Sequence, residues 1–72
     1  MEQFMHKEAI IAVSGGGASY GTVYVGKIVN IDGDFIEIVY NPTNKMNKLR
    51  HSPHSTGRVL VNKRYLLYIE LL

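Results

Sequence analysis

The 72-residue chain contains no cysteine, no tryptophan and only two prolines. Without cysteine it has neither disulfide bonds nor thiolate metal sites, which are common means of stabilising small domains. The same absence fits a protein of the reducing cytoplasm. A chain of this length buries only about 60% of the surface that it exposes when unfolded. We therefore expect one domain over residues 1–72, stabilised by a well-packed core and by self-association.

Long apolar runs are also missing, since no run exceeds five residues. A helix needs about 20 apolar residues to cross a membrane, so no membrane span is expected. Residues 1–7 are too polar to form the apolar centre of a signal peptide, which again favours a cytoplasmic protein. Five tyrosines, two phenylalanines and many β-branched residues argue against disorder.

Short β-prone runs alternate along the chain with glycine, proline and polar residues, a pattern typical of consecutive strands. Residues 1–7 are expected to form a short helical turn, too short to be stable alone, with Phe4 and Met5 in contact with the strands. The strands are expected at residues 9–13, 22–31, 35–40, 58–62 and 65–71. The sequence therefore predicts an all-β fold of five strands.

Two of the expected strands carry further information. In the second strand the apolar residues change phase around Gly26, which predicts a sharp bend or a bulge at the glycine. The last strand is apolar on both faces, with Leu67 and Ile69 on one face and Leu66 and Tyr68 on the other. A small isolated domain cannot bury both faces, so this pattern predicts a strand covered by a partner subunit.

Charge is distributed unevenly along the chain. The net charge of +2 combines −3 over residues 1–40 with +5 over residues 41–72. A concentration of positive charge favours a polyanionic partner such as a nucleic acid. The alternative is a basic loop that is simply solvated.

The polar stretch between the third and fourth strands contains the first group of candidate binding residues. Lys45, Lys48 and Arg50, here called the loop cations, would contact phosphates, and the neighbouring His51 would hydrogen-bond or stack. Repetition of this group in an oligomer would strengthen binding through multivalency.

Two segments resemble the sequence motifs of the Sm family. Residues 26–35 (GKIVNIDGDF) resemble the first Sm motif, in which a glycine, an aliphatic residue, an acidic residue and a turn precede a large apolar residue. Residues 57–69 (GRVLVNKRYLLYI) resemble the second, a hydrophobic strand, a tight turn and another hydrophobic strand. The resemblance covers nearly the whole chain. It implies a small, strongly bent antiparallel barrel whose fourth and fifth strands pair with neighbouring subunits in an RNA-binding ring.

The binding pocket of that family is only partly matched. The positions of its stacking residue and its asparagine hold Asp34 and Ile36, and its arginine–glycine turn matches Asn62 and Lys63. Lys63 and Arg64, here called the turn cations, would supply positive charge near the pore of a ring, whereas Asp34 would oppose it. The resemblance therefore implies the fold more strongly than it implies the uridine pocket.

Other motifs point to no catalytic or metal site. The glycine run at residues 15–17 lacks the lysine and the helix of a phosphate-binding Walker loop. His51 and His54 have no third ligand nearby in the sequence, so no metal site and no cofactor are expected. Ser52 and Ser55 lie beside these histidines, but nothing in the polar loop would orient a base or form an oxyanion hole. An enzyme is therefore not expected.

The sequence thus predicts an Sm-like, ring-forming homo-oligomer that binds RNA or another single-stranded nucleic acid. The alternative is a structural or protein-interaction β-barrel without nucleic-acid binding. The two differ in the salt dependence of binding, because affinity that depends on phosphate contacts falls steeply with salt.

Overall fold

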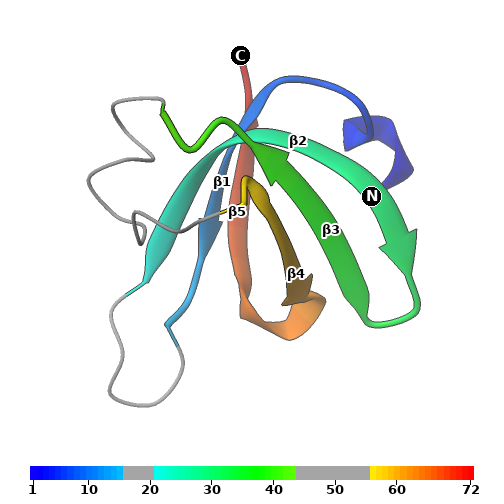
Figure 1. The fold of residues 1–72 in the computed structure, drawn as a ribbon. Helices are drawn as coiled ribbons and strands as arrows, with labels where there is room; N and C mark the ends of the chain where they lie inside the picture. Colours follow the sequence, from blue (N-terminus) through cyan, green and yellow to red (C-terminus); the bar gives the residue numbers. More distant parts are fainter. Residues whose placement is uncertain (16–20, 44–55) are drawn as a thin grey trace.

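The computed structural model describes residues 1–15, 21–43 and 56–72 (Figure 1). Five strands and two short 3-10 turns follow one another along the chain. In order they are η1 (Glu2–Phe4), β1 (Ala9–Val13), β2 (Thr22–Asp32), β3 (Phe35–Tyr40), β4 (Arg58–Asn62), η2 (Lys63–Tyr65) and β5 (Leu66–Leu71). The all-β prediction is confirmed. None of the described helical turns is long and apolar enough to span a membrane.

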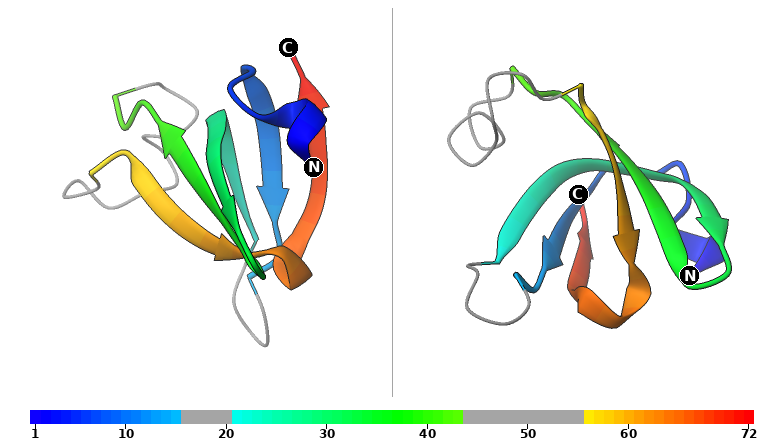
Figure 2. Two further views of the ribbon diagram at one scale, coloured as in Figure 1. Left: turned by 90° about the vertical axis from the view of Figure 1, so that its right-hand side faces the viewer. Right: turned by 60° about the horizontal axis from the view of Figure 1, so that its bottom comes forward.

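The strands form one antiparallel sheet in the order β4-β3-β2-β1-β5. β2 arches over the molecule, and the two edge strands β4 and β5 meet at η2 and diverge from it (Figures 1 and 2). Among the described residues, no ladder joins β4 to β5, so the sheet is not closed into a barrel. Five antiparallel strands are confirmed, whereas closure is not: β5 pairs with β1, and β4 and β5 stand at opposite edges of the sheet.

The core lies on the inner face of the bent sheet. Successive residues of a strand point to opposite faces, so alternate residues of β2 and β3 are buried. The largest fully buried side chains are four isoleucines: Ile11, Ile28, Ile36 and Ile38. Phe4 and Met5 pack against this core from the N-terminal segment, as expected.

Gly26 marks a close approach of β2 to β3. A Cβ at this position would lie 2.2 Å from the carbonyl oxygen of Val39 and 3.0 Å from the Cα of Tyr40, so only glycine fits. The ladder with β3 shifts register between Ile28 and Asn30, beyond the glycine. The predicted irregularity therefore exists, but the bulge follows Gly26 by three residues, because the extra residue is Val29.

The last strand differs from the prediction at its start. Tyr65 belongs to η2, and the register with β1 shifts between Ala12 and Val13. Ile69 packs against the core, whereas Leu67 is 64% exposed and Tyr68 is 52% exposed. The edge strand β5 thus presents large apolar side chains to solvent.

Candidate nucleic-acid interface

The β2–β3 turn and η2 lie together at one end of the sheet. The backbone N–H of Lys63 donates a hydrogen bond of 2.7 Å to the carbonyl oxygen of Asp34, and Phe35 pairs with Asn62 across β3 and β4. These contacts bring residues near position 34 beside the turn cations (Figure 2). The predicted proximity of Asp34 and Lys63 is therefore present in the structure.

Local interactions hold both turns in place. Gly33 supplies the positive φ of +58° that the short β2–β3 connection requires. At the start of η2, the side-chain oxygen of Asn62 accepts a hydrogen bond of 3.0 Å from the backbone N–H of Arg64. Such a side-chain cap satisfies a donor that the short helical turn leaves unpaired. The turn cations are thus carried on a well-defined backbone.

The turn cations are not neutralised by contact with carboxylates. Arg64 is exposed and Lys63 is half-buried, and no carboxylate of the described residues forms an ion pair with either. By contrast, Lys27 lies 3.9 Å from Glu8, and Arg58 forms an ion pair with Glu37. The positive charge of η2 is therefore available to an external anion.

Two exposed aromatic side chains lie at the same end of the sheet. Tyr65 is 40% exposed, and the guanidinium carbon of Arg64 lies 5.9 Å from the centre of its ring. Phe35 is 44% exposed at the start of β3. Exposed aromatic rings beside cations are the elements that proteins use to stack unpaired bases.

The sequence pattern alone indicates no binding role for these two aromatics. Phe35 has the opposite phase in β3 to the core residues Ile36 and Ile38, so strand alternation alone predicts that it faces away from the core. The apolar alternation predicts Tyr65 in the last strand, whereas the structure has it in η2, which Asn62 caps. Ile36 is fully buried, which removes it from any binding surface.

The remaining predicted binding residues, Lys45, Lys48, Arg50 and His51, lie outside the described residues. His54, Ser52 and Ser55 lie outside them as well. In the part of the chain that the structure describes, no group of three or more His, Cys, Asp or Glu side chains is arranged to hold a metal ion.

No protein-family model, no curated protein and no solved structure matches this chain.

Proposed function

We propose that this protein is an Sm-like, ring-forming module that binds RNA or another single-stranded nucleic acid through η2 and the β2–β3 turn. The observation that supports the proposal most is the combination, at one end of the sheet, of two exposed aromatic rings with turn cations that form no ion pair with a carboxylate of the described residues. The resemblance to the Sm motifs supports the same assignment.

The chemistry of this end suits single strands better than duplexes. Lys63 and Arg64 would contact phosphates, while Phe35 and Tyr65 would stack on unpaired bases, at roughly 1–3 kcal/mol per base. A duplex hides the faces of its bases, so it would gain only the phosphate contacts. The exposed Asp34 lowers the local potential, and affinity would then depend on several copies acting together.

The edge strands β4 and β5 offer a means of bringing copies together. Each lies at a free edge of the sheet, and both carry exposed leucines, Leu60 and Leu67, each 64% exposed. Unpaired edge strands readily add a strand from another chain. Pairing of β4 of one copy with β5 of the next is a head-to-tail contact, and such contacts form a ring when the rotation between successive copies closes.

The alternative, a structural or protein-interaction module without nucleic-acid binding, is favoured by the apolar surface of β5. Leu67, Tyr68 and Leu71 are all at least 45% exposed, and this surface has no chemistry suited to phosphates. A module that only assembles would bind its partner through this surface, and the turn cations would have no binding role.

The test is the binding of labelled oligo-U, oligo-A and a duplex, measured by fluorescence anisotropy over a salt series. We expect the single strands to bind more tightly than the duplex, and Lys63→Ala to flatten the logarithmic salt slope by about 0.7. The matched control is Lys27→Ala, which removes one lysine that is paired with Glu8 away from η2. Replacing Phe35 and Tyr65 with leucine should weaken single-strand binding without changing the slope.

Two results would reject the proposal. Absence of binding at low salt would leave the assembly module as the better description. Equal effects of Lys63→Ala and Lys27→Ala would show that only overall charge matters and that η2 is not the interface.

A further inference from the structure

The outer face of β1, β2 and β3, opposite the core, is unusually apolar for a sheet face in contact with water. Ile10, Val23, Val25 and Val39 all point to this face by strand alternation, and all are only partly buried. A solvated face of an antiparallel sheet normally carries polar residues at these positions. The composition of the outer face is that of a covered surface.

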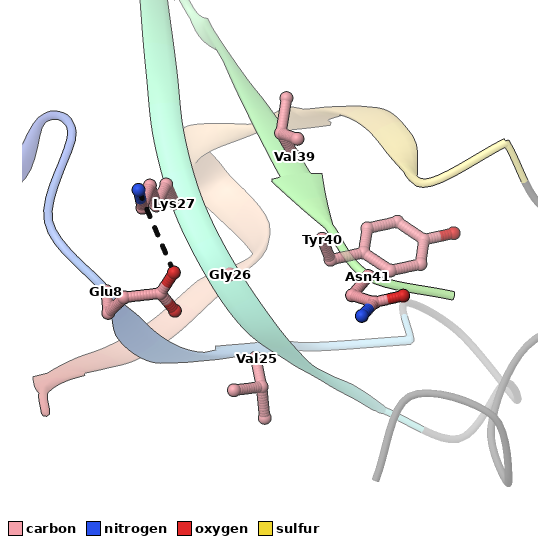
Figure 3. A pocket seen from close by; sticks show the side chains of 7 residues that line it. All are labelled: Glu8, Val25, Gly26, Lys27, Val39, Tyr40 and Asn41. Carbon is pink, nitrogen blue, oxygen red and sulfur yellow. Dashed lines mark ion pairs between the residues drawn. The ribbon is translucent and has the colours of Figure 1, made fainter. Parts of the chain in front are cut away.

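A groove crosses this face where β2 passes β3. It has a volume of about 450 Å³ and is open to solvent. Side chains from both strands border it, with Glu8 near one end (Figure 3). Its lining residues are Glu8, Val25, Gly26, Lys27, Val39, Tyr40 and Asn41.

The sheet register places complementary groups on opposite sides of Gly26. On one side, Ile10 of β1 stands beside Glu70 of β5. On the other, Val39 of β3 stands beside Arg58 of β4. Consider a second copy that faces the first across this surface, related to it by a two-fold axis parallel to the sheet. If the axis runs diagonally across β2 at Gly26, it places Ile10 of each copy over Val39 of the other. The same rotation brings Glu70 of each copy toward Arg58 of the other, which is exposed and already paired with Glu37 in its own copy.

The central charges are also complementary under this axis. Glu8 of each copy is brought toward Lys27 of the other, and the Lys27–Glu8 pair within one copy is loose at 3.9 Å, with both side chains about half exposed. Four such groups can then alternate in sign across the interface. The strands of the two sheets cross at a steep angle, as in orthogonal sheet packing.

We infer that the outer face is a two-fold interface between two copies of this chain, in which Ile10 of each copy enters the groove between Val25 and Val39 of the other. A stable interface buries roughly 800 Å² per partner, about one sixth of the 4941 Å² surface of this chain. This contact uses side chains on the outer face, Glu70 and Arg58 of the edge strands included, and leaves the backbone edges of β4 and β5 for the pairing that the proposed ring requires.

The test is sedimentation equilibrium of the full chain over the micromolar range. Ile10→Lys should raise the dissociation constant of the two-fold contact at least about tenfold, because a second cation would enter a groove already bordered by Lys27. Glu70→Lys should weaken it as well, and added salt should relieve part of that effect. Circular dichroism checks that both variants keep the sheet. The control is Leu67→Lys on the β5 edge, which should disrupt a ring and leave the two-fold contact intact.

Three outcomes would overturn the inference. One is a wild-type protein that stays monomeric across this range, and another is an unchanged dissociation constant in both outer-face variants. The third is complete loss of association in Leu67→Lys, which would assign all self-association to the sheet edges. Loss in the outer-face variants with persistence in Leu67→Lys supports the two-fold contact even if no nucleic acid binds.

Discussion

Substitution of Gly26 tests the close approach on which the bend of the sheet depends. In Gly26→Ala the added methyl would lie 2.2 Å from the carbonyl oxygen of Val39, and real Cβ atoms do not come this close to backbone atoms. A backbone carbonyl cannot rotate away as the end of a side chain can. The strands β2 and β3 must therefore move apart at the pair formed by Gly26 and Tyr40.

The expected loss in the free energy of unfolding of Gly26→Ala is the sum of three contributions. Overpacking of this kind costs about 1–3 kcal/mol, and loss of one ladder hydrogen bond adds about 1 kcal/mol. Removal of a glycine from the unfolded chain recovers about 0.4–1 kcal/mol. The free energy of unfolding should fall by about 1–3.5 kcal/mol in Gly26→Ala, and further in Gly26→Val.

Urea denaturation followed by circular dichroism measures this change as a shift of the midpoint at constant slope. The control is Gly33→Ala, where nothing lies within 4 Å of the added Cβ and the cost comes only from the positive φ. That cost is roughly 1–2 kcal/mol. A neutral or stabilising Gly26→Ala, or one less costly than Gly33→Ala, would refute the close approach.

Three further predictions concern single sites. His6 has a positive φ of 63°, so His6→Gly should be more stable than His6→Ala by about 1 kcal/mol in the same urea titration; equal stabilities would contradict the strain. Burial, and then the neighbouring Tyr40, raise the pKa of Tyr24 above its usual 10.0. Folding thus favours the neutral form of Tyr24. The free energy of unfolding should keep this contribution in full below about pH 10 and lose it as the pH rises further. In Tyr24→Phe this pH dependence should be absent. Alanine in place of all three loop cations should flatten the salt slope equally for oligo-U and oligo-A. Alanine in place of the turn cations should instead change the affinity for oligo-U relative to oligo-A. Identical responses to the two sets of substitutions would contradict this distinction.

The strands were readily predictable from sequence because turn residues border them. The bounds of β1, β3 and β4 agree with the prediction, and β2 is longer by Asp32. The start of β5 was not predictable from periodicity, since Tyr65 continues an apolar alternation and leaves the strand only because Asn62 caps η2. The sequence pattern predicts the bend or bulge at Gly26 because the glycine breaks the alternation, whereas the register shifts between Ile28 and Asn30, which brings Ile31 back to the inner face.

The candidate site was predictable only in part. The turn cations stand out in the sequence by their charge, and the Sm motifs placed them near Asp34. The exposure of Phe35 and Tyr65 depends on how the two turns meet, a tertiary contact made by the hydrogen bond from Lys63 to Asp34. Local propensity carries no information about such a contact between segments 29 residues apart.

The pairing of β1 with β5 bears on how the chain folds. β1 is the first strand and β5 the last, and their ladder joins Ala9 to Leu71. Pairing of segments so distant in sequence requires closure of nearly the entire chain as one loop, and domains dominated by such contacts fold in milliseconds to seconds. The hairpin of β2 and β3, joined by a two-residue turn, can form much earlier. Until β5 arrives, Ile11 has strand neighbours on one side only, so the slowest step of folding and the burial of the core are expected to coincide.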